Sequence, residues 1–445
     1  MSALYELPTM TNTTFVPESP QSIEETGLNV AFLSDLALKH IYFEGFVGAL
    51  DVANALKLPY KGITEELLEG LKRERMIEVK GTNSGGLGTS SYQYAITDKG
   101  SARAREMLER SQYVGPAPVP LRMYIIGARR QSLQDVRIRP GDIKQAFSHL
   151  VINKDIFEQI GPAANSGRSI FLFGPPGNGK TSIAEAIGDM ILRDEVYIPY
   201  AIEASGSIIK FYDPINHIVA SDDMPMPAGT GFLTGAKRVD QRWLKIRRPA
   251  IMVGGELTLE MLELAYDRDG KFYEAPLQMK ANGGLFLIDD FGRQQVRPQD
   301  LLNRWIVPLE KRIDYLTLQT GVNFEIPFDV LVIFATNLAP RQLVDDAFLR
   351  RIRHKIDVKN PALEEYRSIF QAACRTKNVE YSDQVLAYLL KEYYIKPDRE
   401  LRACHPRDLI DQIIDVANFL NIEPKMTKDM IDRACRSYFA ADMHK

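Results

Sequence analysis

The sequence predicts an α/β protein with a parallel β-sheet covered by helices on both faces, flanked along the chain by two smaller domains. Three observations predict this class. From about residue 140, apolar strand patterns alternate with helical patterns, which is typical of parallel sheets. After Asn360-Pro361 the pattern is helical to the end of the chain. Before residue 114, three helical patterns are followed by two strand patterns.

Length and composition set the broad class. The 445 residues are enough for two or three domains, each with its own core. The composition, 45% hydrophobic and 25% charged, is that of an ordinary globular protein. A formal net charge of −3 gives no general attraction to nucleic acid or to an anionic membrane. No apolar run approaches the roughly 20 residues that span a bilayer, so we expect no membrane span.

The N-terminus and the cysteines favour a cytoplasmic protein. The first 20 residues lack the basic start and apolar centre of a secretory signal. Cys374, Cys404 and Cys435 lie about 30 residues apart, without the paired spacing of a metal site. We therefore expect reduced, mostly structural thiols.

Composition and periodicity also predict where the domains begin and end. The first residues mix Pro, Thr, Ser and Glu with little periodicity, which favours a mobile tail. The stretch "VGPAPVP" is proline-rich and predicts a stiff, extended linker. The predicted units are a tail at 1–27, a small domain at 28–111, a linker at 112–139, the α/β domain at 140–359 and a helical lid domain at 360–445.

The small N-terminal domain shows the order helix, helix, helix, strand, glycine-rich loop, strand and helix. This order resembles a winged-helix domain. Apolar spacing predicts the helices, and β-branched and aromatic residues predict the strands. The predicted helices are 29–43, 49–59, 63–76 and 97–111, and the predicted strands are 77–81 and 92–97.

The charge balance of this domain bears on its partner. Residues 28–111 contain 11 Lys plus Arg and 11 Asp plus Glu, and the glycine-rich wing contains no basic residue. Neutralisation of phosphates supplies much of the affinity of proteins for DNA. A neutral module therefore favours docking to protein or to another subunit, and duplex DNA remains the alternative.

The strongest local signal is "SIFLFGPPGNGKTSIAEAIGDMIL", residues 169–192. It places the phosphate-loop pattern G-x-x-x-x-G-K-[ST] between a strand and a helix, the context that this P-loop pattern requires. Its backbone N–H groups and the helix N-terminus attract phosphates. Lys180 is predicted to reach the β- and γ-phosphates of ATP, and Thr181 to hold Mg²⁺. The predicted nucleotide contacts are Gly174, Pro175, Pro176, Gly177, Asn178, Gly179, Lys180, Thr181 and Ser182.

Further patterns follow in a fixed order along the chain. The apolar run "LFLI" ends at Asp289 and Asp290, and "LVIFAT" ends at Asn337. The segment "DDAFLRRIRHKI" contains three arginines, and "HPRDLIDQI" opens a helix near the C-terminus. Together with the phosphate loop, these patterns resemble the AAA+ ATPase superfamily over roughly residues 140–440. The resemblance implies a P-loop NTPase core with a helical lid.

The resemblance also implies roles for individual residues. Asp289 matches the acid that orients the Mg²⁺ shell with Thr181, and Asn337 matches the sensor that orients the attacking water. Arg407 matches the second sensor, which contacts the γ-phosphate. In the arginine segment, Arg350 and Arg353 match the two arginines that project into the nucleotide of a neighbouring subunit, with Arg351 between them.

Asp290 departs from the family pattern, in which the residue after the Mg²⁺ acid is commonly Glu. Aspartate has the same chemistry as a general base but reaches about 1.5 Å less far. Misplacement on the order of 1 Å can lower a rate about 10²-fold. We therefore expect a working but slow ATPase with Asp290 as the base. The alternative is a structural acid in a protein with negligible hydrolysis.

Two inserts indicate the branch of the superfamily. The run Ala281-Asn282-Gly283-Gly284 resembles the approach to the acid-bearing strand in MoxR-like ATPases, magnesium-chelatase motors and σ54 activators. Residues 312–337 contain "YLTLQ" and "NFEIP" on either side of Thr320-Gly321, which predicts the β-hairpin that precedes the first sensor in that branch.

The region 195–280 is longer than a minimal core needs. It holds a glycine-rich stretch at 229–237, which we expect to be a flexible loop. Phe211, Tyr212 and Phe232 are the candidates for a pore loop that contacts a client. The alternative is that these aromatic residues pack in a core or an interface.

The resemblance implies a ring, most simply a homo-hexamer, in which ATP hydrolysis by a chaperone-like motor remodels a protein client bound by the winged helix or the pore. Two alternatives remain open from the sequence. One is a DNA-associated regulator or loader that uses the winged helix. The other is an ATP-controlled assembly scaffold with little turnover.

Overall fold

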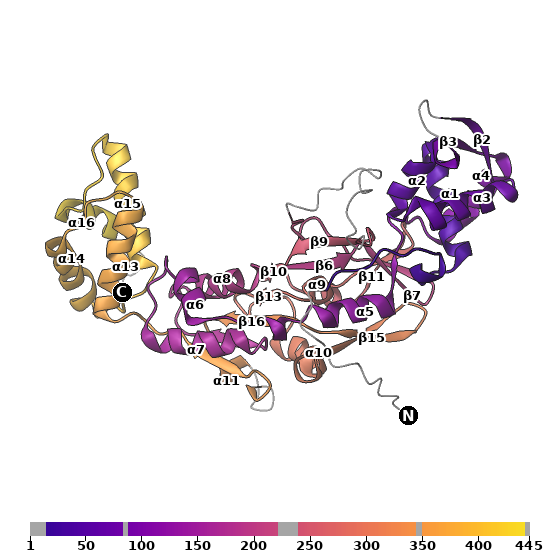
Figure 1. The fold of residues 1–445 in the computed structure, drawn as a ribbon. Helices are drawn as coiled ribbons and strands as arrows, with labels where there is room; N and C mark the ends of the chain where they lie inside the picture. Colours follow the sequence, from indigo (N-terminus) through magenta and orange to yellow (C-terminus); the bar gives the residue numbers. More distant parts are fainter. Residues whose placement is uncertain (1–14, 83–87, 221–238, 344–348, 441–445) are drawn as a thin grey trace.

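The computed structural model describes residues 15–82, 88–220, 239–343 and 349–440. Figure 1 shows an elongated molecule with three lobes, in which a central α/β lobe separates an N-terminal lobe from a C-terminal helical lobe. The described part contains no helix that is long and apolar enough to cross a membrane. Cys374, Cys404 and Cys435 are all free, as expected.

The N-terminal lobe combines helices with a small antiparallel sheet. The predicted third helix buries Leu67, Leu68 and Leu71 on one face, and Asn29 caps the first helix by accepting from the Ala31 N–H. The sheet has the order β1-β3-β2, and its edge strand β1 was not predicted. The elements are α1 (Val30–Glu44), β1 (Phe46–Gly48), α2 (Ala49–Leu56), α3 (Glu65–Arg73), β2 (Ile77–Thr82), β3 (Tyr92–Ile96) and α4 (Asp98–Arg110).

The prediction of a mobile tail at 1–27 is wrong for its described part, residues 15–27. Phe15 is buried, and its ring meets that of Trp243 edge-on at 5.6 Å. Arg242 and Asp240 form a fully buried ion pair at 2.8 Å, and Arg242 also donates to the Thr26 carbonyl at 2.9 Å. Phe15 and Thr26 therefore contact residues more than 200 positions away along the chain, and local composition could not indicate these contacts.

The prediction of a linker at 112–139 is also wrong, because most of the segment is folded. The strand β4 (Val119–Pro120) pairs in parallel with β7 (Ala201–Ala204). The helix α5 (Leu121–Arg130) follows β4 and buries Tyr124 in a core that also contains Ile202 of β7. Proline is tolerated in β4 because this strand lies at the edge of its sheet.

The central sheet is parallel, with the strand order β10-β13-β16-β5-β17. Alternate side chains along each strand enter opposite cores. Leu172, for example, packs in the core with α6, α7 and α8, and Phe171 packs with Trp305 of α10 on the other face. The predicted fold class is therefore confirmed. Its elements are β5 (Ile170–Phe173), β10 (Ala250–Val253), β13 (Leu285–Ile288), β16 (Leu331–Thr336), β17 (His354–Asp357), α6 (Pro140–Ala146), α7 (Lys154–Asn165), α8 (Lys180–Ile191), α10 (Pro298–Lys311) and α11 (Pro340–Leu343).

The long region after α8 contributes strands to two further sheets, one with the order β11-β12-β8-β7-β4 and one formed by β6 and β9. Phe211, a pore-loop candidate, is only 1% exposed and packs against Tyr124 and His217, so its assignment to a pore is wrong. The ring of Tyr212 lies against those of Tyr200 and His217. Phe232 and the glycine-rich stretch 229–237 lie outside the described residues. The elements are β6 (Glu195–Pro199), β7, β8 (Ser207–Lys210), β9 (Trp243–Arg247), β11 (Ala265–Asp267), β12 (Phe272–Glu274) and α9 (Leu277–Lys280).

The predicted β-hairpin is present as β14 (Ile313–Thr317) and β15 (Asn323–Pro327), paired antiparallel. Gly321 lies in its turn with φ +82°, a conformation that favours glycine. Leu316 and Ile326 pack in the core that also contains Tyr124.

The C-terminal lobe is helical, as predicted, and has its own apolar core. A buried chain of polar groups crosses it: the Tyr366 and Tyr394 hydroxyls lie 2.7 Å apart, and Tyr394 is 2.9 Å from His405 Nδ1. The helices are α13 (Leu363–Thr376), α14 (Asp383–Leu390), η6 (Lys391–Ile395), α15 (His405–Leu420) and α16 (Lys428–Tyr438).

Candidate nucleotide-binding site

The phosphate loop lies at the carboxyl end of β5, where the buried strand ends at Phe173 and α8 begins at Lys180. Gly174 has φ +138°, and a Cβ atom there would lie 2.3 Å from the Val358 carbonyl oxygen. Gly179 has φ +80°, and a Cβ atom added there would have no atom within 4 Å. Close packing therefore requires glycine at position 174, and the backbone conformation favours it at position 179. The first turn of α8 directs its unpaired N–H groups toward this loop.

Lys180 is buried and folds back over the loop. Its Nζ donates to the carbonyl oxygens of Gly174 at 3.0 Å and Pro175 at 2.8 Å. Burial lowers the pKa of Lys180, and the nearby carboxylates of Asp289 and Asp290 oppose that shift. A cation whose hydrogen bonds go to neutral carbonyl groups, beside a helix N-terminus, fits an anionic ligand such as a triphosphate.

The next residue of α8 connects the loop to the acid-bearing strand. Thr181 Oγ1 donates to Asp289 Oδ2 at 2.9 Å, although β16 lies between β5 and β13. A hydroxyl and a carboxylate are the oxygen ligands that Mg²⁺ prefers, with phosphates and water completing its shell. No group of three or more His, Cys, Asp or Glu side chains suited to a metal occurs among the described residues. The hydroxyl of Thr181 and the carboxylate of Asp289 lie together and fit Mg²⁺ by this chemistry.

Asp290 and Asn337, predicted separately from two strands, lie in direct contact. Asn337 Nδ2 donates to Asp290 Oδ1 at 3.1 Å. Asp290 has φ +48°, in the left-handed region, where Asp and Asn are tolerated much better than most residues. This backbone gives a physical reason for the shorter acid at position 290.

The sequence analysis did not identify Gln294, whose hydrogen bonds stabilise the turn after Asp289 and Asp290. Its Nε2 donates to the carbonyl oxygens of Asp289 at 2.9 Å and Asp290 at 3.3 Å. On the other side, Thr336 Oγ1 donates to the Phe291 carbonyl at 2.7 Å. A glutamine four residues after Asp290 in a glycine-containing turn was the available signal.

The helical lobe touches the phosphate loop at two of its predicted residues. Asn178 is buried, and its Nδ2 donates to Asn360 Oδ1 at 2.8 Å, while its Oδ1 accepts from the Ala403 N–H at 3.1 Å. The Cys404 N–H donates to the Gly177 carbonyl at 2.8 Å. The Asn178 side chain therefore forms hydrogen bonds with Ala403 in the helical lobe and with Asn360 in the segment just before α13.

Arg407 lies in the first turn of α15, three residues after Cys404. Its guanidinium pairs with Asp408 at 3.3 Å, and its side chain is 69% exposed. Asp408 also accepts from the Tyr438 hydroxyl at 2.7 Å. The chain therefore brings the start of α15 to the phosphate loop, with Arg407 at the surface beside it.

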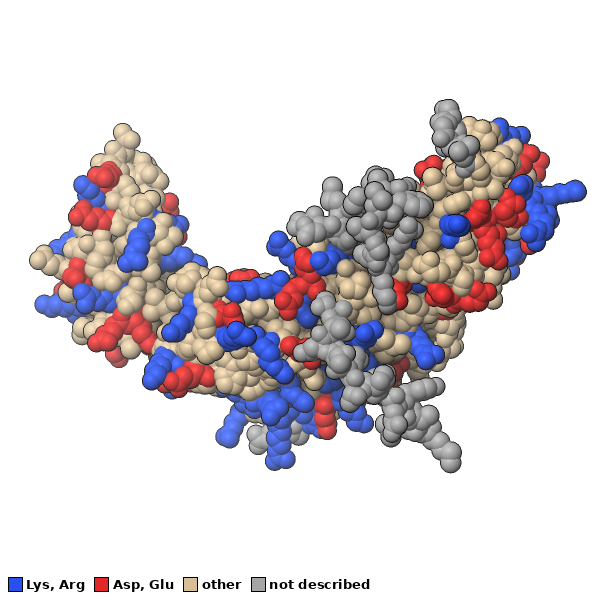
Figure 2. All heavy atoms as spheres, in the orientation of Figure 1, with Lys and Arg blue, Asp and Glu red and all other residues tan. Residues whose placement is uncertain are grey.

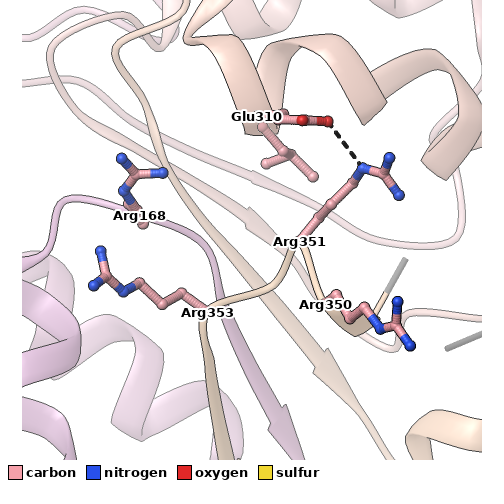
Figure 3. Close-up of a pocket in the computed structure, with 6 residues that line it drawn as sticks. Arg168, Glu310, Arg350, Arg351 and Arg353 are labelled. Carbon is pink, nitrogen blue, oxygen red and sulfur yellow. Dashed lines mark hydrogen bonds and ion pairs between the residues drawn. The ribbon is translucent and has the colours of Figure 1, made fainter. Parts of the chain in front are cut away.

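The predicted trans-acting arginines occupy a different place. Arg353 directly precedes β17, and Arg168 lies two residues before Ile170, which pairs with His354. Both therefore lie at the amino ends of neighbouring strands, whereas the phosphate loop follows the carboxyl end of β5. The cavity between them has a volume of about 600 Å³ and is shown in Figure 3; its lining residues are Arg168, Leu309, Glu310, Arg350, Arg351 and Arg353.

Comparison with known proteins gives partial matches only. A family model described as a domain of unknown function, DUF8689, matches residues 362–437, within the helical lobe. No curated protein matches the chain.

Solved structures give distant matches. NtrX from Brucella abortus with ADP is 13% identical, with a TM-score of 0.38 over 65% of this chain and 56% of that chain. NtrX from the same organism with ATP is 14% identical, with a TM-score of 0.38 over 63% and 52%. A RuvB mutant from Thermotoga maritima is 13% identical, with a TM-score of 0.35 over 69% and 72%. The chain thus covers little more than half of the length of the NtrX structures.

Proposed function

We propose that the chain is an AAA+ ATPase of the MoxR-like branch that binds ATP with Mg²⁺, hydrolyses it and uses the energy to remodel a protein client. One observation carries the proposal. The carboxyl edge of the sheet brings together Lys180, the Thr181–Asp289 pair and the Asp290–Asn337 pair, which come from the start of α8 and from the ends of two strands, β13 and β16. These are the groups that phosphoryl transfer requires: a cation, metal ligands and a base beside a polar orienting group.

ATP binds with its phosphates in the loop 174–179. Lys180 exchanges its two carbonyl partners for phosphate oxygens, which gives charge-assisted hydrogen bonds in place of neutral ones. Thr181 and Asp289 are the residues that would hold Mg²⁺, which when bound neutralises charge on the phosphates. Arg407 extends from α15 toward the same nucleotide.

Asp290 is the general base. Its carboxylate takes a proton from the water whose oxygen forms the new bond to the γ-phosphorus, while the bond from that phosphorus to the bridging oxygen breaks. The products are ADP and phosphate. Asn337 fixes the direction of the carboxylate through its hydrogen bond and places a second amide proton beside the attacking water.

Nucleotide binding is coupled to the helical lobe through the loop. Gly177 and Asn178 contact Cys404 and Ala403, so a loop that closes on phosphates moves these contacts with it. The lobe then changes its angle to the sheet during the cycle, and this motion acts on the client.

The N-terminal lobe, a winged-helix-like module, docks a protein. Figure 2 shows basic and acidic side chains interspersed over this lobe on the face drawn. Arg103 is paired with Asp35 and Glu106, and Arg110 with Glu106, so these cations are already neutralised within the lobe. A protein partner suits such a surface better than the uniform negative charge of duplex DNA.

A second candidate, an ATP-controlled scaffold with little turnover, is favoured by one observation. The Asp290 carboxylate is short, its backbone is fixed in the left-handed region, and one of its oxygens is already bonded to Asn337. These features limit its reach toward water. Hydrolysis and assembly therefore have to be measured separately.

The test is to measure binding of a fluorescent ATP analogue and steady-state hydrolysis for wild type, Lys180→Ala and Asp289→Asn. We expect Lys180→Ala to lose binding, and Asp289→Asn to bind nucleotide with a much weaker dependence on Mg²⁺. Asp269→Asn, in a loop away from the site, serves as the matched control and should behave as wild type. Equal binding by wild type and Lys180→Ala would refute the proposal.

A further inference from the structure

The turn that carries Asp290 is anchored on both sides of that residue. Before it, the Asp289 N–H donates to the Val253 carbonyl of β10 at 2.8 Å. After it, the Phe291 N–H donates to the Ala335 carbonyl of β16 at 2.7 Å, and the Phe291 ring is buried. The two neighbours of Asp290 are therefore held by two different strands, and the backbone of Asp290 spans the step between these anchors.

The side chain of Gln294 adds a connection around this step. Its Nε2 donates to the Asp289 carbonyl at 2.9 Å and to the Asp290 carbonyl at 3.3 Å. Its Oε1 accepts from the Gly292 N–H at 2.8 Å. A side-chain amide has two donor hydrogens and one acceptor oxygen, so this side chain matches the three backbone groups that surround it.

The two carbonyl groups that Gln294 bonds flank the φ and ψ torsions of Asp290. A change in either torsion moves one carbonyl relative to the other, and a single donor group that bonds both resists that change. The restrained conformation is uncommon, because φ is +48°, in the left-handed region. A residue with a side chain keeps such a conformation only where the surroundings enforce it. Gln294 therefore restrains the backbone of Asp290.

This backbone conformation determines where the Asp290 carboxylate lies. Aspartate has one carbon between Cα and its carboxyl group, so the carboxylate follows any movement of the backbone. In the observed conformation, Asp290 Oδ1 accepts from Asn337 Nδ2 at 3.1 Å. A longer acid has one more rotatable bond with which to correct its direction, and aspartate does not. The short acid at position 290 therefore depends on a restrained turn.

We propose that Gln294 is a positioning residue for ATP hydrolysis, which keeps the backbone of Asp290 left-handed and thereby keeps the carboxylate of the base beside Asn337. This inference rests on the proposed function, because it takes Asp290 as the base. Gln294 acts through the backbone and takes no part in proton transfer. Asp290 and Gln294 form a matched pair, since the short acid needs the restraint and the left-handed region disfavours glutamate more than aspartate.

The first test compares Gln294→Met with Gln295→Met in the full chain. Methionine is close to glutamine in length and shape but cannot form the three hydrogen bonds. Gln295 is the next residue along the chain and is exposed, which makes it the matched control. We expect Gln294→Met to lower kcat roughly tenfold or more, because misplacement of a catalytic group on the order of 1 Å costs about 10²-fold. Gln295→Met should stay within about twofold of wild type.

Nucleotide binding distinguishes a positioning role from general damage to the site. In Gln294→Met, Asp289 keeps its backbone hydrogen bond to Val253 and its side-chain bond to Thr181. Binding of the fluorescent ATP analogue, and the dependence of that binding on Mg²⁺, should therefore stay within about twofold of wild type. Equal losses in kcat and in nucleotide binding would show that the substitution disrupts the whole site, and would overturn the assignment.

A double-mutant cycle with Asp290→Glu tests the matched pair. In the wild-type background, glutamate is forced into the left-handed region. Without the Gln294 amide, the turn relaxes and glutamate adopts an ordinary backbone conformation. We expect Asp290→Glu to lower kcat at least threefold less in the Gln294→Met background than alone, and to lower the free energy of unfolding less as well. Equal effects of Asp290→Glu in the two backgrounds would refute the proposal.

The outcomes separate this inference from the proposed function. If wild type hydrolyses no more ATP than Lys180→Ala, the proposed function and the positioning role fail together. If wild type hydrolyses ATP and Asp290→Asn does not, but Gln294→Met matches wild type in kcat, then Asp290 remains the base and only the role of Gln294 is wrong.

Discussion

The side-chain amide of Asn337 donates to the carboxylate of Asp290 across 3.1 Å, at the ends of two adjacent parallel strands. This contact unites a predicted base with a predicted sensor, and it fixes the carboxylate in one direction. Replacing Asn337 by Ala should lower the hydrolysis rate roughly 10²-fold. ATP binding should stay within a few-fold of wild type. Measurement of kcat and of nucleotide affinity checks this prediction. Asn418→Ala, a change at an exposed position of α15, is the control. Parallel losses in kcat and in affinity for Asn337→Ala would contradict the prediction.

The left-handed backbone at Asp290 predicts how this position tolerates substitution. Glu is strained there by about 1 kcal/mol or more, whereas Asn adopts the region readily. Asp290→Glu should therefore lower the free energy of unfolding by about that amount, and Asp290→Asn should leave it nearly unchanged. Denaturant unfolding measures both. Equal stability of the Glu and Asn variants would show that φ +48° does not constrain this position.

The Asn178 side chain predicts a link between the phosphate loop and the helical lobe. Asn178→Ala removes the acceptor of the Ala403 N–H and the donor to Asn360, at about 1 kcal/mol for each hydrogen bond. The amide hydrogens of Ala403 and Cys404 should exchange with solvent about tenfold faster. Hydrogen-exchange mass spectrometry tests this against Asn54→Ala, which lies exposed on α2. Unchanged exchange at Ala403 would mean that the loop does not hold the lobe.

The buried ring of His217 predicts a loss of stability in acid. Its Nδ1 accepts from the Asp213 N–H at 3.0 Å, and its Nε2 lies 3.0 Å from the Lys280 carbonyl, which requires the neutral ring with the proton on Nε2. Burial lowers the pKa of His217 below its usual 6.5. At a pH between the lowered pKa of His217 in the folded protein and its usual value of 6.5, the unfolded chain binds more protons than the folded chain. Stability therefore falls as the pH decreases below about 6.5.

This pH dependence is measured as the free energy of unfolding of wild type and His217→Phe between pH 7.5 and pH 5. The Phe ring keeps the stack on Phe211 but cannot titrate. The difference in stability between the two proteins should shrink or reverse toward pH 5. A difference that is independent of pH would contradict the account.

The fold of the central lobe could be predicted because its signals are local. The apolar runs at 170–173, 285–288 and 331–336 are almost entirely buried, and they lead into the phosphate loop, Asp289 and Asn337 respectively. The phosphate loop identifies which edge of the sheet binds a ligand. Asp290 and Asn337 then fall at that same edge, because the carboxyl ends of parallel strands meet there.

The features that could not be predicted depend on contacts between distant segments. Phe15 is ordered by Trp243, and β4 by β7, so composition alone suggested a tail and a linker. The sequence left open whether Phe211 lies in a pore loop or in a core, and its contact with Tyr124 of α5 places it in the core. Arg168 and Arg353 line the same cavity because of the register of β5 and β17, which pairs Ile170 with His354. The left-handed backbone at Asp290 likewise has no signal in the residue types around it.

The most direct test of the central claim is steady-state ATP hydrolysis by wild type beside Asp290→Asn, with ATP binding and oligomer mass recorded for each. The account predicts that wild type turns over ATP, and that Asp290→Asn keeps binding and assembly but loses hydrolysis by roughly 10²-fold or more. If both proteins hydrolyse ATP equally, Asp290 is not the base. If neither does so above the level of Lys180→Ala, the scaffold replaces the motor.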